Sequence, residues 1–198
     1  MFPSSNLCGK TESMTEVDDF TWVREAQAGD RQAFARLVQR HYRLMYKLAW
    51  QFCGVKDQAE DIAQEASIKL AQSLGAFRFE SSFTTWLYRL VINTAKDNAR
   101  GRNRRSENEL PLFEDAVFVS PEASPEQKLQ DKDVLKMVAR LPVDLKETVI
   151  LCYWQGLSHK EASMVLECSE GTVSWRLHEA RKKMGSELGI KGEGRNHG

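Results

Sequence analysis

Helical periodicity is the feature that most constrains this chain. Between Arg31 and Cys53, apolar residues recur every three or four positions, which places them on one face of an α-helix. They are Phe34, Leu37, Val38, Leu44, Met45, Leu48, Ala49 and Phe52. We find no segment that alternates apolar and polar residues with the period of a β-strand. The sequence therefore predicts an all-α fold.

Caps and breaks in this periodicity divide the chain into two halves. The expected helices cover about Asp19–Ala28, Arg31–Cys53, Asp57–Leu74, a segment after Ser81-Ser82, Pro125–Leu141, Val143–Gln155, a short helix ending at Leu166, and Glu170–Leu188. Between Gly101 and Pro125 periodicity fails, and prolines and acids dominate. We expect two small helical domains joined by a flexible acidic linker: an N-terminal tail at 1–18, the first domain at 19–101, the linker at 102–125, the second domain at 126–189 and a C-terminal tail at 190–198.

Charge is distributed unevenly, although the formal net charge is zero. Seven basic and two acidic residues between Ala76 and Arg105 give +5, Ser106–Leu135 carries −6, and the chain from Gly171 onward carries +3. A local basic patch sets the field that a phosphate backbone meets, so zero net charge does not exclude a nucleic-acid partner. The pattern fits two nucleic-acid-facing modules around an acidic connector, or chance among solvated surfaces.

Other function classes find little support. The longest apolar runs are far below the ~20 residues that span a bilayer, and the N-terminus lacks the features of a signal peptide. We therefore expect a cytoplasmic chain with no direct membrane insertion. The four cysteines include no C-x-x-C pair, so reduced structural thiols are expected, with no metal and no cofactor. The histidines pair with no acid or cysteine at a catalytic spacing, which argues against an enzyme.

The helix after Ser82 carries two different faces. The apolar face consists of Phe83, Trp86, Leu87, Leu90 and Val91. The polar and net basic face consists of Arg89, Asn93, Lys96, Asp97 and Arg100. Trp86 lies in the apolar stripe, so a core role is favoured for it over a contact with a ligand.

Ser158 to Met184 has the pattern of a helix-turn-helix. Ser158 and Glu161 are spaced as a capping box for the first helix, and Ser169 is placed to cap the second. In the second helix Val173 and Leu177 face the core, which leaves an outer surface of Ser174, Trp175, Arg176, His178 and Arg181. A helix of this kind fits the major groove of B-DNA. Trp175 is equally placed to contact DNA or to pack against the neighbouring helix.

Three segments resemble the bacterial sigma factors, and most closely their compact extracytoplasmic-function group. Ala59–Glu65 resembles region 2.2, and Phe83–Asn93 resembles regions 2.3 and 2.4. Leu141-Pro142, Gly156–Glu161 and Gly171–Val173 resemble region 4. The motifs occur in the family's order, without a region 3, over about Asp19–Leu188.

The resemblance implies a transcription initiation factor that binds core RNA polymerase, through the β′ clamp and the β flap, and directs it to promoter DNA. The polymerase-binding residues would be Asp61, Gln64 and Glu65, which otherwise form an ordinary solvated helix face. The residues that read the minus-10 element as single-stranded DNA would be Phe77, Arg78, Phe79, Trp86, Arg89, Asn93, Lys96 and Arg100.

The resemblance further implies minus-35 recognition by Thr172, Ser174, Trp175, Arg176, His178 and Arg181, with phosphate contacts from Ser158, His159 and Lys160. An anti-sigma factor and a stress or envelope response are expected from the same family. This sequence departs from the family pattern at Phe79 and Glu167, where glycine is usual, and at Ser174-Trp175, where a basic and then a small residue are common. The alternative function is a stand-alone helix-turn-helix regulator, which leaves the motifs at Ala59–Glu65 and Phe83–Asn93 unexplained.

Overall fold

The structure is a computed structural model that describes residues 12–104 and 134–187 of the 198-residue chain. Within these ranges every regular element is helical, which confirms the predicted all-α class. The elements are α1 (Glu12–Gln27), α2 (Arg31–Cys53), α3 (Lys56–Ser73), the 3-10 helix η1 (Leu74–Ala76), α4 (Phe83–Arg104), a helical stretch at 134–139, α6 (Val143–Val149), the π-helical turn η2 (Ile150–Trp154), α7 (His159–Leu166) and α8 (Glu170–Glu187).

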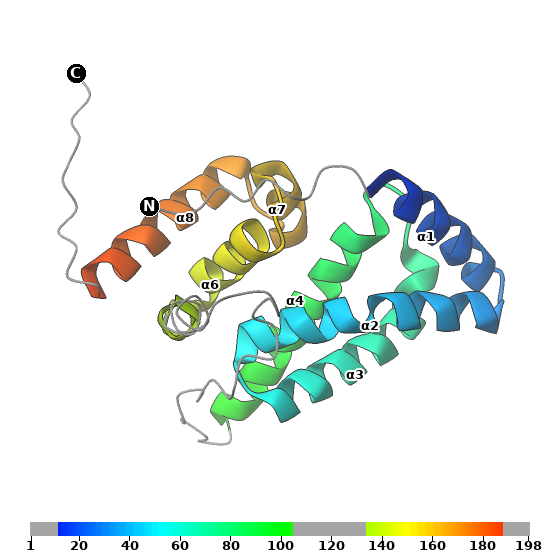
Figure 1. Ribbon diagram of the computed structural model, residues 1–198, viewed down its shortest axis with the longest axis horizontal. Coiled ribbons are helices and arrows are strands. Elements are labelled where there is room, and N and C mark those ends of the chain that lie inside the picture. Colours follow the sequence, from blue (N-terminus) through cyan, green and yellow to red (C-terminus); the bar gives the residue numbers. More distant parts are fainter. Residues whose placement is uncertain (1–11, 105–133, 188–198) are drawn as a thin grey trace, which may run out of the picture.

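The described helices form two groups (Figure 1). Helices α1 to α4 pack around one another, and α6, α7 and α8 form a second group beside α4. We refer to them as the first and the second helical group. The two-group arrangement confirms the predicted division of the fold into two helical parts.

The core of the first group is built from the predicted apolar faces. Leu37 and Leu48 of α2, Ile62 of α3, and Phe83 and Leu87 of α4 are at most 1% exposed. Removing this apolar surface from water is the main favourable contribution to folding. Because one side of α4 is fixed in this core, its opposite side faces away from the first group.

Local sequence signals define the ends of α2. The Asp30 side chain accepts hydrogen bonds from the backbone N–H groups of Gln32 and Ala33, at 2.7 and 3.2 Å. These groups have no partner within the helix itself, so an acceptor at the cap satisfies them. Gly54 ends the helix in the left-handed conformation, with φ of 76°, which glycine adopts without steric cost.

The helix-turn-helix also follows its sequence signals. Ser158 and Glu161 form the predicted capping box, and the Ser169 side chain accepts a hydrogen bond from the Thr172 N–H at 3.1 Å. Between the two helices, Glu167 adopts the left-handed conformation with φ of 53°. Val173 and Leu177 of α8 are buried, as predicted.

Three helix boundaries differ from the predictions. Helix α1 begins at Glu12 rather than near Asp19, and α4 continues past Gly101 to Arg104. The helix expected over Val143–Gln155 changes at Ile150 to a π-helical turn, in which the Gln155 N–H donates to the Ile150 carbonyl at 3.1 Å. An added residue in one turn leaves the apolar pattern nearly helical, so periodicity does not reveal it.

Several expectations fall outside the described residues. The acidic linker expected at 102–125 does so apart from residues 102–104, which belong to α4. The same holds for residues 1–11, for the start of the helix expected at Pro125, and for the tail at 190–198. Among the described helices, none is long and apolar enough to cross a membrane.

The cap of α2 gives a test of this local analysis. Asp30→Ala removes the acceptor for two N–H groups, so we expect the free energy of unfolding to fall by about 1 kcal/mol in urea titrations followed by circular dichroism. Arg31→Ala, at the neighbouring exposed position, serves as the control and should have little effect. Equal destabilisation by both substitutions would contradict the capping role.

Candidate functional site

Helix α3 presents the predicted polar stripe on its outer face. The side chains of Asp61 and Gln64 are exposed, and the Glu65 carboxylate lies 3.0 Å from the ammonium of Lys69. Ile68, on the same face, is 59% exposed. We call Asp61, Gln64, Glu65 and Ile68 the α3 surface. It combines negative charge, an amide and an exposed apolar side chain.

The aromatic residues before α4 pack against one another. Phe77 is only 5% exposed, and its ring centroid lies 5.0 Å from that of Phe79 and 5.5 Å from that of Trp86. Phe77, one of the residues predicted to contact minus-10 DNA, therefore does not lie on the surface, because it packs between Phe20 of α1 and Phe83 of α4. Trp86 is half-buried beside Phe83, in agreement with the favoured core role.

Phe79 has an unusual backbone conformation, with φ of 60°. A bulky residue rarely adopts this left-handed region, which costs roughly 1–2 kcal/mol. The side chain offsets part of this cost through ring contacts with Phe20 at 5.5 Å and Phe77, and through the Arg24 guanidinium at 5.1 Å. Arg78, between the two phenylalanines, is exposed.

The polar face of α4 is intact, but each of its three cations already lies near a carboxylate of this chain, Arg100 near Asp97 at 3.6 Å. The α4 face, as we define it, consists of Arg89, Asn93, Lys96 and Arg100. Asn93 is exposed, and the Arg100 side chain is 69% exposed. The Arg89 guanidinium lies 2.7 Å from the Glu167 carboxylate, and the Lys96 ammonium lies 2.9 Å from that of Glu147.

Both carboxylates belong to the second helical group. Sequence reasoning missed these partners because Glu147 and Glu167 lie far from α4 along the chain and in no motif that pairs them with it. No local signal in the sequence indicates such pairs.

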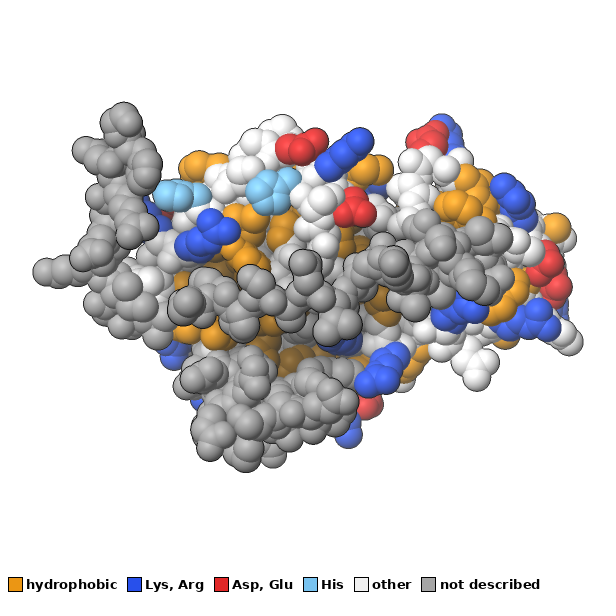
Figure 2. Space-filling view, turned by 45° about the horizontal axis from the view of Figure 1, so that its top comes forward, with side chains coloured by type: hydrophobic (Ala, Val, Ile, Leu, Met, Phe, Trp, Pro, Cys, Tyr) orange, Lys and Arg blue, Asp and Glu red, His pale blue; other side chains and the backbone are white. Residues whose placement is uncertain are grey.

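The exposed side of α8 gathers most of the predicted minus-35 residues. Ser174, Trp175, His178 and Arg181 are exposed, and Trp175 is 58% exposed. Trp175 therefore does not pack against the neighbouring helix, which favours its interpretation as a residue that contacts DNA. Figure 2 shows histidine, basic and apolar side chains close together over this part of the molecule.

Contacts within the helix-turn-helix restrain several of these side chains. The Ser174 hydroxyl lies 2.9 Å from Nδ1 of His159, which links α8 to α7. Arg181 donates to the hydroxyl of Tyr153 and stacks on its ring. Sequence reasoning did not single out Tyr153, which holds a cation on the recognition helix.

The remaining polar residues near the turn divide into capping and exposed groups. The Ser158 hydroxyl donates to Glu161 in the capping box, and the Thr172 hydroxyl bonds to that of Ser169 at 2.9 Å. Lys160 is exposed beside them. Ser158 thus serves the helix end, and a phosphate contact from its hydroxyl would compete with the Glu161 carboxylate.

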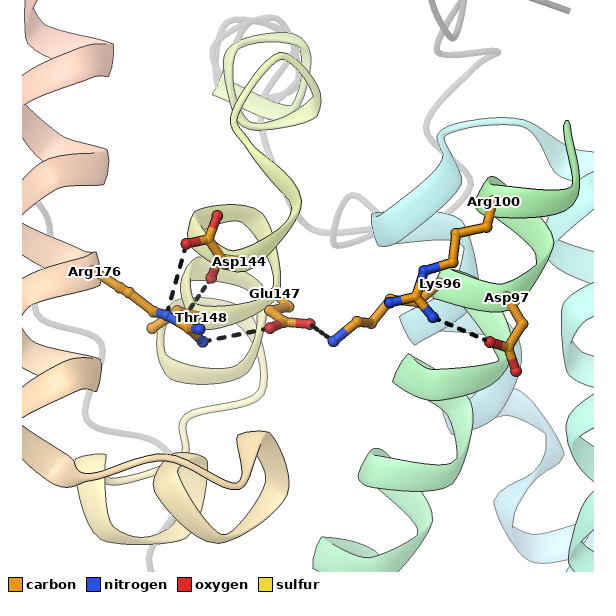
Figure 3. A network of polar contacts seen from close by, with 7 residues as sticks. All are labelled: Lys96, Asp97, Arg100, Asp144, Glu147, Thr148 and Arg176. Carbon is orange, nitrogen blue, oxygen red and sulfur yellow. Dashed lines mark hydrogen bonds and ion pairs between the residues drawn. The ribbon is translucent and has the colours of Figure 1, made fainter. Parts of the chain in front are cut away.

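Arg176 does not lie on the outer face of α8, where its position in the sequence had suggested it. Its side chain is only 18% exposed, with Nη1 3.4 Å from Glu147 and Nε 3.9 Å from Asp144 (Figure 3). Two carboxylates of α6 draw the guanidinium inward, because ion pairs in a partly buried setting are screened little by solvent.

Three of the cysteines lie within the described residues. Cys53, Cys152 and Cys168 are free thiols. Burial raises the pKa of the Cys152 thiol to about 11, which keeps it protonated and a poor nucleophile at neutral pH. Within the described ranges no group of three or more His, Cys, Asp or Glu side chains is arranged to hold a metal ion.

Comparisons with known proteins match both helical groups. The family model for sigma-70 region 2 matches residues 37–105, and the model for sigma-70 region 4 matches residues 131–184. The first match includes α3 and α4, and the second includes the helix-turn-helix.

Solved structures share the fold. A structure of CnrH, in complex with the cytosolic domain of CnrY, superposes with a TM-score of 0.65 at 23% identity and covers 88% of this chain and 99% of that one. The sigma factor RpoE of Bartonella quintana, in complex with the anti-sigma factor NepR, gives a TM-score of 0.64 at 22% identity over 80% of this chain and 98% of that one.

Curated relatives are similar over nearly their whole length. The RNA polymerase sigma-H factor of Pseudomonas aeruginosa is 35% identical over 185 residues, which are 88% of this chain and 96% of the relative. The ECF RNA polymerase sigma-E factor of Escherichia coli K12 is 32% identical over 183 residues, 87% of this chain and 95% of the relative. Two matching family models in the right order, together with these relatives, show that the chain belongs to the ECF RNA polymerase sigma factors.

Proposed function

We propose that this chain is a transcription initiation factor that binds core RNA polymerase and directs it to specific promoters. The observation that carries the proposal is the presence of three distinct surfaces on one chain: the α3 surface, the α4 face and the outer side of α8. A DNA-binding regulator needs only the last of these. The family membership supplies a reason for all three.

The α3 surface is the proposed contact with the β′ clamp of the polymerase. Asp61 and Gln64 are exposed, and an exposed Ile68 beside them offers apolar area to a partner. Polymerase binding would bury this area and give the negative charge a basic counterpart. Residues 19–101 are the proposed extent of this domain.

The α4 face is the proposed site for the minus-10 element. A single strand needs cations along its backbone and planar groups for its bases. Arg89, Lys96 and Arg100 supply the charge, and Asn93 offers both a donor and an acceptor to a base edge. Phe79 and Trp86, both half-buried and both in ring contact with Phe77, are the proposed planar groups.

The outer side of α8 is the proposed site for the minus-35 element. Its exposed residues present an indole, an imidazole and a guanidinium to one groove, and Lys160 lies near for a phosphate. We assign Arg176 a supporting role, because its guanidinium is held by α6. The proposed second domain covers residues 126–189 and also contacts the β flap.

Regulation and location follow from the same proposal. RpoE of B. quintana was solved with an anti-sigma factor, and we propose a partner of that class for this chain, released during a stress or envelope response. The chain would act in the cytoplasm, where core polymerase and promoter DNA are found, and would catalyse no reaction of its own.

Run-off transcription tests the proposal as a whole. Purified core polymerase is supplied with a library of promoter fragments, with and without the protein. Transcripts that require the protein would support the proposal and locate both promoter elements. Duplex binding without transcription or co-elution with core polymerase would instead favour the stand-alone regulator.

The α3 surface gives a first specific prediction. Asp61→Arg reverses a charge on an exposed position, so we expect loss of co-elution with core polymerase and an unchanged unfolding midpoint. Glu25→Arg, on the exposed side of α1, is the matched control and should still co-elute. Retained co-elution of the Asp61 variant would remove this surface from the polymerase contact.

The α4 face gives a second specific prediction. Asn93→Ala removes a donor and an acceptor from an exposed position, and we expect it to reduce permanganate reactivity of the opened promoter more than binding of minus-35 duplex DNA. Asn98→Ala, on another side of the same helix, is the control. A normal transcription bubble with the Asn93 variant would show that this side chain does not assist opening.

The recognition helix α8 gives a third specific prediction. Trp175→Ala should cost about 1–3 kcal/mol of binding free energy for duplex DNA that carries the minus-35 element, measured by fluorescence anisotropy. Because the indole is exposed, stability should change by less than about 0.5 kcal/mol. Val143→Ala, at an exposed apolar position of α6, should leave DNA binding intact. Unaltered affinity of the Trp175 variant would assign the indole no role in DNA binding.

A further inference from the structure

Helix α1 holds the aromatic segment that precedes α4. The Phe20 ring centroid lies 6.3 Å from that of Phe77 and 5.5 Å from that of Phe79. Two turns further along α1, the Gln27 side-chain amide donates to the backbone carbonyls of Leu74 and Phe77, at 2.9 and 3.0 Å. Two rings and two carbonyls of the segment are therefore in contact with one face of α1.

Arg24 lies on this same face of α1 and contacts Phe79. Positions 20, 24 and 27 fall on one side of a helix. The Arg24 guanidinium lies over the Phe79 ring, 5.1 Å from its centroid. Phe77 is 5% exposed, Phe79 is half-buried, and Arg24 is exposed. Arg24 is therefore the member of this cluster that a ligand would meet first.

The charge of Arg24 is not compensated by a neighbouring carboxylate. No carboxylate among the side chains that the structure describes forms an ion pair with its guanidinium. In contrast, each of the three cations of the α4 face lies near a carboxylate of this chain. Arg24 can therefore accept an anionic or aromatic ligand without first breaking an ion pair.

The contact between Arg24 and Phe79 combines two groups that bind single-stranded nucleic acids. Unstacked bases pack on aromatic rings and on the planar guanidinium of arginine. Phe79 keeps its ring here although its φ of 60° favours glycine, and Arg24 is the one polar group among the ring contacts described for it. A ring and a guanidinium thus lie together where α1 meets the segment before α4.

We propose that Arg24 is a further DNA-binding residue of the minus-10 site, and that its guanidinium stacks on the unpaired base that packs against Phe79. Gln27 is then a positioning residue, because it holds the backbone of the segment that carries the ring. This inference rests on the proposed function and deepens it, since it adds a contact from α1 to the minus-10 site of the α4 face.

Holoenzyme assembled from core polymerase and the full chain tests this contact. Anisotropy gives its affinity for a fluorescent single-stranded oligonucleotide that carries the minus-10 element, as located by run-off transcription. Arg24→Ala should weaken binding about fivefold or more, the lower end of what one stacked base contributes. Lys182→Ala removes an exposed cation of α8 and is the matched control, which should bind like the wild type. Wild-type affinity of the Arg24→Ala variant would overturn the proposal.

Arg24→Lys separates stacking from charge, because lysine keeps the cation and lacks the planar group. We expect it to weaken binding nearly as much as Arg24→Ala does. Abasic substitution along the oligonucleotide should identify one position where wild-type binding falls and binding by the Arg24→Lys variant falls less. Full affinity of the Arg24→Lys variant would show that the residue provides only a charge for phosphate, and the base contact would be wrong.

Gln27 is tested by removing its donor at nearly constant volume. Gln27→Met should weaken oligonucleotide binding and speed amide hydrogen exchange of residues 77–80 in the free chain. Gln27→Lys again supplies N–H donors and should restore both. In a Phe79→Gly background, Gln27→Met should change the affinity little, because no ring remains to be positioned. An equal loss of affinity in both backgrounds would exclude a positioning role.

Two measurements separate this inference from the proposed function. Because Arg24 is exposed, its variants should keep the wild-type unfolding midpoint and still co-elute with core polymerase. If the wild type directs transcription and the Arg24→Ala variant binds the oligonucleotide normally, the inference fails and the proposed function stands. If the wild type directs no specific transcription, both fail.

Discussion

The arrangement of the molecule depends on helix α4, which packs into the core of the first helical group on one side and carries charged side chains on the other. One side is fixed by Phe83, Leu87 and Val91, which are at most 1% exposed in the core of the first helical group. This packing fixes the rotation of the helix, and so it fixes where Arg89 and Lys96 point. The second helical group therefore contacts a surface that the core has already oriented, the same surface that is proposed to bind the minus-10 strand. Burial of the apolar side orients the helix, and the charges on the other side determine what the helix contacts there.

Most of the fold follows from local features of the sequence, because caps and periodicity act within a few residues. Asp30, Gly54 and the Ser158–Glu161 box act where their positions predict. The site is less predictable wherever it depends on contacts between distant segments. Phe77 was expected to contact minus-10 DNA but packs between α1 and α4, and Arg176 was expected on the outer face but is drawn inward by Asp144 and Glu147. A helical repeat predicts the side of the helix on which a residue lies. It does not predict which residues from distant segments that side chain will contact.

The two departures from the family's glycine pattern have similar backbone consequences and different contacts. Phe79 and Glu167 both hold positive φ angles that disfavour a side chain, yet each side chain makes a specific contact. Phe79 joins an aromatic cluster within the first helical group, whereas Glu167 reaches Arg89 across the boundary between the groups. A strained backbone conformation persists where the contacts of the side chain compensate for it, as they do at these two positions.

The aromatic cluster around Phe77 also bears on the thermodynamics of DNA capture. Phe77, Phe79 and Trp86 already shield one another from water, so a base that stacked on the half-buried Phe79 and Trp86, as proposed, would meet rings that are already partly covered. Little additional apolar surface of these rings would leave water in such a contact. Because the heat-capacity change of binding follows the apolar area that is buried, the rings of this cluster would contribute little to it. The heat-capacity change of promoter binding would then report mainly on polymerase and duplex contacts made elsewhere.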